Sequence, residues 1–109
     1  MEELAYKIKA DFLGALAHPL RLQVIEFLKG GEKNVGAIIK TLGIPQSSLS
    51  RHLTILRETG ILKSRQQGTT IYYAIDDRDI FSVLRPIAEM LRKKLKKTEA
   101  VLNSLGKEE

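Results

Sequence analysis

A run of small polar side chains at residues 46–54 is the part of the sequence best suited to contact another molecule. Six of its residues are expected to face outward and can donate or accept hydrogen bonds, namely Gln46, Ser47, Ser48, Ser50, Arg51 and Thr54. No acidic residue occurs from Gln46 up to Glu58. Small neutral and basic side chains can approach a polyanion closely and can hydrogen-bond to base edges and phosphates. The run therefore predicts a surface that contacts DNA.

Within this run, Arg51 can bind the O6 and N7 atoms of guanine or a phosphate, and the alternative is an arginine that is simply solvated. Gln46, Ser47 and Ser48 open a predicted helix, where side chains and free N–H groups can meet bases or a phosphate. Capping of the helix is the alternative role for the serines. We expect the DNA contacts to centre on this helix start.

The residue inventory excludes several other kinds of chemistry. The chain has no cysteine, which removes disulfides, iron–sulfur clusters, thiolate metal sites and redox-sensing thiols. Its two histidines are too few for an ordinary His-based catalytic zinc site. We find no nucleophile–base pair at helical spacing, no glycine-rich phosphate loop and no carboxylate pair suited to a cleft. We therefore expect neither an enzyme nor a bound metal or cofactor.

Hydrophobic periodicity predicts four helices before residue 60. They cover residues 2–17, residues 19–28 up to Gly30-Gly31, residues 35–42 and residues 46–59. Pro19 fits the first turn of the second helix, and Asn34 is a good N-cap for the third. Gly43 is expected to end the third helix.

The third and fourth helices, within residues 35–59, are joined by the short connection Gly43-Ile44-Pro45-Gln46. Two short helices with such a tight turn form a helix-turn-helix, whose second helix enters the major groove of DNA. Leu49, Leu53 and Leu56 follow helical spacing and are expected to face the core. The polar run on the same helix then faces outward.

Residues 62–75 predict a β-hairpin directly after the helix-turn-helix. Its strands are expected at residues 63–66 and 70–75, with a turn at Gln67-Gly68. Such a hairpin forms a wing against the flanking phosphates or the minor groove. Arg65, Gln67, Gly68 and Thr69 fit this role, and an ordinary hairpin turn is the alternative.

A heptad seam predicts a long last helix over residues 79–105. Its seam positions are Phe81, Leu84, Ala88, Leu91, Leu95, Thr98, Leu102 and Leu105, of which all but Thr98 are apolar. Pro86 lies inside it and should kink or divide the helix. Leu84, Leu91, Leu95 and Leu102 belong either to the core of one chain or to a dimer seam, and a stripe of this kind near a chain end favours a dimer.

The net charge of +5 is concentrated in the middle of the chain. Residues 33–75 contain six basic residues and one acidic residue, while the flanking segments nearly balance. A basic segment of this kind favours a nucleic-acid partner. No apolar stretch approaches the ~20 residues that a membrane span needs, and no signal-peptide pattern opens the chain. We therefore expect a cytoplasmic protein with no membrane partner.

Three blocks of sequence resemble the ArsR/SmtB family of winged-helix repressors. They are ALAHPLRLQVIEFL at residues 15–28, QSSLSRHLTILRETGIL at residues 46–62 and KSRQQGTTIYYAI at residues 63–75. The resemblance spans about residues 4–95. It implies a homodimer built from the first and last helices, with Leu4, Ile8 and Phe12 on the first. It also implies that each recognition helix contacts half of an inverted-repeat operator in double-stranded DNA.

The resemblance also assigns roles to three further residues. His52 matches the family's histidine before leucine. A contact with a phosphate is one role for this side chain, and a packed, hydrogen-bonded histidine is the alternative. His18 and Arg21 match a block that we interpret as helix-entry and scaffold residues.

The metal-sensing positions of the family are altered here. Asn34, Val35 and Gly36 stand where one site type has Cys-Val-Cys. A second site type keeps its aspartate at Asp77, but Asp79, Met90 and Lys93 stand at its other three positions. A lysine at a ligand position repels a metal ion. The signal is then an unknown small molecule, a partner protein, or none.

Together these features predict a mainly α protein with a β-hairpin wing, an α+β winged helix-turn-helix in the order ααααββα. We expect one domain over residues 1–109. The expected function is a dimeric, sequence-specific transcriptional regulator, most simply a repressor. A loosely specific architectural DNA-binding protein and a winged-helix protein-interaction module are the alternatives.

Overall fold

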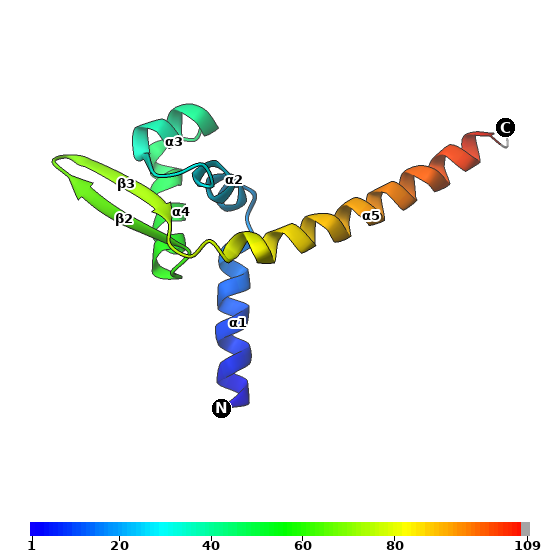
Figure 1. Cartoon of the computed structure of the whole chain (residues 1–109), viewed down its shortest axis with the longest axis horizontal. Helices are drawn as coiled ribbons and strands as arrows, with labels where there is room; N and C mark the ends of the chain where they lie inside the picture. The colour runs from blue at the N-terminus through cyan, green and yellow to red at the C-terminus, as the bar shows by residue number, and fades with distance from the viewer. Residues whose placement is uncertain (108–109) are drawn as a thin grey trace. The chain divides into compact units, whose positions relative to one another are not determined.

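The structure is a computed structural model and describes residues 1–107. Five helices and three strands follow in the order α1 (Glu2–Leu16), α2 (Pro19–Leu28), β1 (Lys33–Asn34), α3 (Val35–Leu42), α4 (Gln46–Glu58), β2 (Leu62–Gln67), β3 (Thr70–Ile75) and α5 (Ile80–Lys107) (Figure 1). The predicted order of four helices, a hairpin and a last helix is confirmed. The sequence did not predict β1, because two residues are too few to show a strand periodicity.

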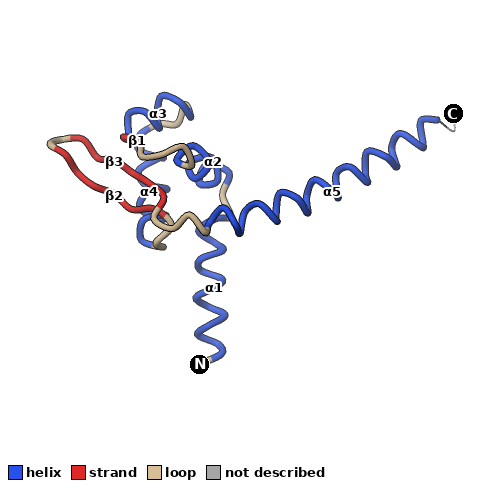
Figure 2. Tube along the Cα trace, in the orientation of Figure 1, coloured by secondary structure: helices blue, strands red, loops and turns tan. Residues whose placement is uncertain are grey.

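The three strands form one antiparallel sheet in the order β1-β3-β2 (Figure 2). Lys33 pairs with Tyr73 in β3, and Gln67 pairs with Thr70 across the hairpin. The turn therefore consists of Gly68 and Thr69, one residue later than predicted. Gly68 adopts φ +63°, a left-handed conformation that side chains disfavour, so glycine suits the first position of this turn.

Side-chain caps fix the helix starts that the sequence predicted. The Leu20 N–H donates to Nδ1 of His18, the N-cap of α2, at 3.1 Å, and Pro19 occupies the first turn. The Ala37 N–H donates to Oδ1 of Asn34, the N-cap of α3, at 2.8 Å. Gly43 ends α3 in the left-handed conformation. These contacts confirm the predicted boundaries of both helices.

Residues 1–77 form a compact unit whose core lies between α2, α3, α4 and the sheet. Its fully buried side chains come from all these elements, and they include Val24, Ile25, Leu28, Ile38, Leu49, Leu53, Leu56 and Leu62. Tyr73 is buried, whereas Tyr72 on the other face of β3 is half-buried. The inward apolar positions predicted for α4 are thus confirmed.

The second compact unit starts at Arg78 and contains α5. This helix runs without interruption through Pro86, so the proline does not divide it. Proline removes one helical N–H, and the turns before and after it keep the helix intact. Within the described residues, no helix has the length and apolar character needed to cross a membrane.

Candidate nucleic-acid interface

The helix α4 separates an apolar face from a polar face. Leu49, Leu53 and Leu56 are buried beneath it. Gln46, Ser47, Ser50 and Arg51 are exposed, while Ser48 and Thr54 are half-buried. Six of the seven residues predicted on this helix therefore lie outside the core. The Thr54 hydroxyl donates to the Ser50 carbonyl at 2.9 Å, which fixes its rotamer and leaves its lone pairs to accept.

The first turn of α4 carries no side-chain cap. Pro45 holds the N-cap position and makes no side-chain cap hydrogen bond. The first N–H groups of a helix have no partner within the helix and attract anions. Gln46, Ser47 and Ser48 thus add side-chain donors to a helix end that already favours a phosphate.

His52, the seventh predicted contact on α4, lies in the interior and is only 7% exposed. Its Nδ1 accepts a hydrogen bond from Nε of Arg21 at 3.1 Å, and its ring lies 4.3 Å from that of His18. Arg21 also donates to the carbonyls of Gly14 and Ala15 at the end of α1. The structure therefore favours the packed alternative for His52 and a scaffold role for His18 and Arg21.

The environment of His52 disfavours its charged form. Burial lowers the pKa of His52 below its usual range, and the nearby His18, Arg21 and Arg51 act in the same direction. A neutral ring with an unprotonated Nδ1 is also what the hydrogen bond from Arg21 requires. His52 thus connects α4 to Arg21 of α2 and to His18 in the interior, unlike the other six residues predicted as contacts on α4.

Arg65, the predicted phosphate contact of the hairpin, is held in a clamp across the sheet. Its Nε and Nη2 donate to the two carboxylate oxygens of Glu32 at 2.8 and 2.6 Å. Its Nη1 donates to Oε1 of Gln67 at 2.9 Å, and its guanidinium lies 4.3 Å from the ring centre of Tyr72. Glu32 immediately precedes β1, whereas Arg65 lies on β2, so the pair spans all three strands.

The clamp reinforces the charge of both partners. The hydrogen bonds from Arg65, and then the positive charges of Arg65 and Lys63, lower the pKa of the Glu32 carboxyl. The same pairing raises the pKa of Arg65. Both groups are therefore ionised at neutral pH, and the positive charge predicted for the wing is balanced locally by Glu32.

A groove of about 530 Å³ lies between α3, α4 and the hairpin. Four of the predicted DNA contacts line it, namely Gln46, Ser50, Thr54 and Thr69. Val35, Ile39 and Tyr73 supply part of its apolar wall, and none of its lining residues is charged. The groove thus brings polar residues of the recognition helix together with the turn of the hairpin. Gln67 and Gly68 are exposed beside Thr69 at that turn.

The residues predicted at a dimer seam are largely uncovered in the single chain. On α1, Leu4 and Ile8 are exposed and Phe12 is half-buried. On α5, Leu84 is half-buried, whereas Leu91, Leu95 and Leu102 are 54%, 70% and 62% exposed. Exposed apolar residues that repeat along one side of a helix typically mark a contact with another chain.

Sequence reasoning missed Glu32 and Tyr72 as partners of Arg65, and it missed the groove. Glu32 is 33 residues away from Arg65, so no local pattern connects the two. Asn34, at the first altered metal-site position, serves as a helix cap. Within residues 1–107, no group of three or more His, Asp or Glu residues is placed to hold a metal ion.

Comparison with known proteins identifies relatives over most of the chain. Residues 18–64 match the family model described as bacterial regulatory protein, arsR family. The HTH-type transcriptional regulator Rv0081 of Mycobacterium tuberculosis is 35% identical over 104 residues, which span 94% of this chain and 91% of that protein. The transcriptional repressor PagR of Bacillus anthracis is 37% identical over 91 residues, 80% of this chain and 91% of PagR.

Solved structures share the fold. The crystal structure of Rv0081 matches with a TM-score of 0.78 and 33% identity, covering 86% of this chain and 95% of that one. The solution structure of Mb0332 from Mycobacterium bovis, a homodimeric winged helix-turn-helix DNA-binding domain, matches with a TM-score of 0.77 and 27% identity, over 88% of this chain and 89% of that one. The observed element order and these matches together show that the chain belongs to the arsR family of bacterial regulatory proteins and has a winged helix-turn-helix fold.

Proposed function

We propose that the chain is a homodimeric, sequence-specific DNA-binding repressor. The observation that carries this proposal is the exposed face of α4, where Gln46, Ser47, Ser50 and Arg51 lie outward over a leucine core with no acid before Glu58. A helix that needed only to be soluble would carry acids and lysines on such a face. In a helix-turn-helix this is the face that enters the major groove.

Individual contacts are proposed for residues of α4 and of the hairpin turn. Arg51 binds a guanine edge or a phosphate. Ser48, Ser50 and Thr54 add hydrogen bonds to DNA along its major groove. Gln67, Gly68 and Thr69 place the turn of the hairpin against the flanking backbone. Gly68 matters there because it lets the backbone itself come close.

A dimer through α1 and α5 follows from the uncovered apolar residues of both helices. Two chains related by a twofold axis present two recognition helices to one duplex, and the operator is then an inverted repeat. The homodimer described for Mb0332 supports this arrangement. The proposed domain plan is a DNA-binding part over residues 35–75, with dimerisation helices at residues 2–17 and 79–105.

The recognition helix is tested by two variants measured on one duplex. Arg51→Ala, and separately the pair Ser48→Ala/Ser50→Ala, should weaken binding by about tenfold to a hundredfold, the cost of losing a good base contact. Arg85→Ala, which removes the same charge from α5, is the matched control and should change affinity little. Unchanged affinity in both test variants would show that α4 does not contact DNA.

Two alternative functions are decided by simpler observations. An architectural DNA-binding protein would bind a selected duplex and random DNA with similar affinity. A protein-interaction module would bind neither, and the acid-free outward face of α4 argues against it.

A further inference from the structure

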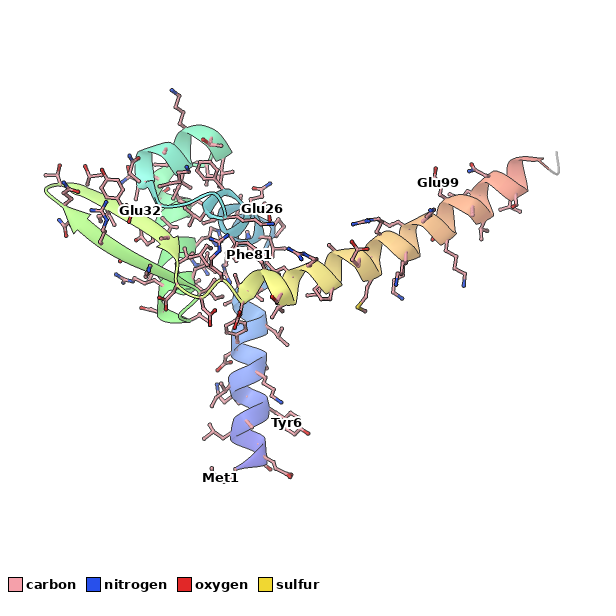
Figure 3. The ribbon with its side chains drawn as sticks, in the orientation of Figure 1. Met1, Tyr6, Glu26, Glu32, Phe81 and Glu99 are labelled. Atoms are coloured by element: carbon pink, nitrogen blue, oxygen red, sulfur yellow. The ribbon has the colours of Figure 1, made fainter. Side chains whose placement is uncertain are left out.

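The ion pair between Glu32 and Arg65 bears directly on how the wing meets DNA. Arg65 is the one basic residue among the predicted wing contacts, and the side chain is 51% exposed. Glu32 accepts from two of its nitrogens, so both carboxylate oxygens face the guanidinium. Figure 3 shows Glu32 at the edge of the hairpin, whereas Glu26 lies on α2.

The ion pair between Glu32 and Arg65 has good hydrogen-bond geometry but contributes little to the free energy of unfolding. A two-point pairing of guanidinium and carboxylate has good direction, yet an exposed ion pair contributes little to stability because water screens it. A phosphate offers the same two-point geometry to a guanidinium. Exchange of Glu32 for a phosphate therefore costs Arg65 little.

Glu32 weakens DNA binding both when Arg65 leaves it for a phosphate and when Arg65 stays paired with it. If Arg65 moves to a phosphate, its two hydrogen bonds to Glu32 are lost. If Arg65 stays on Glu32, its charge is neutralised and it displaces no counterion from the duplex. In both cases Glu32 lowers the affinity of the protein for DNA.

Resting on the proposed function, we propose that Glu32 is an intramolecular competitor of DNA for Arg65 and lowers the affinity of the wing for the phosphate backbone. Tyr72 and Gln67 hold the guanidinium at the hairpin from its other sides, at 4.3 Å and 2.9 Å. Arg65 therefore keeps its place when the carboxylate is removed. Glu32 is thus a residue that sets affinity without contacting a base.

The test is a double-mutant cycle with Glu32→Gln and Arg65→Gln, measured by fluorescence anisotropy on a selected duplex and on a random duplex. The amide of Glu32→Gln still accepts one hydrogen bond from Arg65, so the change removes charge with little change of shape. We expect Glu32→Gln to bind both duplexes about threefold to tenfold more tightly than the wild type, because Arg65 then contacts a phosphate without losing a carboxylate partner. Arg65→Gln should bind more weakly than the wild type.

Glu26→Gln is the matched control, because it removes the same charge from α2. Glu26→Gln should raise the affinity for DNA less than Glu32→Gln does in the wild-type background. In the Arg65→Gln background, Glu32→Gln should raise the affinity no more than Glu26→Gln does. An equal gain from Glu26→Gln, or a gain that persists without Arg65, would overturn the proposed competition and show a general effect of net charge.

Two further outcomes separate this inference from the function on which it rests. Weaker binding by Glu32→Gln, or unchanged binding by Arg65→Gln, would overturn the competition while leaving DNA binding in place. Failure of the wild type to bind any duplex would overturn the proposed function and the inference with it.

Discussion

At the scale of single residues, the polar side chains near α4 divide into outward contacts and one buried group. Arg51 is exposed on α4, whereas the adjacent His52 is buried and accepts from Arg21. Helical periodicity alone separates these neighbours poorly, because position 52 lies at the border of the apolar stripe. The sequence therefore left both roles open for His52, and only the contact with Arg21, 31 residues away, distinguishes them.

The buried state of His52 predicts a loss of stability in mild acid. The pKa of His52 is lowered in the folded chain relative to 6.5, mainly by burial. As the pH falls below 6.5, the unfolded chain binds a proton that the folded chain does not, so the free energy of unfolding decreases until the folded pKa is reached. Above this window the contribution is constant.

Urea unfolding at about pH 7.5 and about pH 5 measures this effect against other titrations. His52→Asn keeps an acceptor near the position of Nδ1 but cannot take up a proton in this range. The wild type should lose more stability between the two pH values than His52→Asn, since all other titrating groups are shared. Equal losses would show that His52 does not carry a lowered pKa.

At the scale of elements, side-chain caps and glycines define the helix-turn-helix. Asn34 caps α3, Gly43 ends it, and α4 follows after a short connection. These signals are local, which is why the sequence predicted α2, α3 and α4 closely. The two-residue β1 and the shift of the hairpin turn depend on pairing with β3, which no local pattern contains.

The side-chain cap of α3 contributes measurably to the free energy of unfolding. Asn34→Ala removes the acceptor for the Ala37 N–H and should lower the free energy of unfolding by about 1 kcal/mol, within the usual range of about 0.5–2 kcal/mol for such caps. Asn34→Ser keeps a capping oxygen and should lose much less. A chemical denaturation series decides the point, and equal stability of Asn34→Ala and the wild type would contradict it.

The seam of α5 predicts a change in assembly from one substitution. Leu95 is 70% exposed in the single chain and lies at a seam position of the heptad. Leu95→Glu places a charge in the proposed dimer contact and should shift the protein toward monomer in sedimentation equilibrium. Lys96→Glu introduces the same residue on the neighbouring outer position and should remain dimeric. Dimers of equal stability in both variants would place the interface elsewhere.

At the scale of the whole molecule, the charge distribution changes once the chain is folded. In the sequence, the basic segment at residues 33–75 has a single acid, Glu58. In the structure, Glu32, one residue outside that segment, folds back onto Arg65 and lowers the net charge of this surface by one. The polar outward face of α4 was predictable because its pattern is local, whereas the pair of Glu32 and Arg65 depends on residues that the sheet brings together.

Sequence-specific binding of DNA by this chain is tested by competition between a selected duplex and a random duplex. A duplex recovered from a random pool by the wild type is labelled and displaced by itself or by random duplex at fixed salt. We expect a preference of about a thousandfold or more for the selected duplex, with affinity that falls steeply as salt rises. A preference near one would contradict sequence-specific recognition by α4.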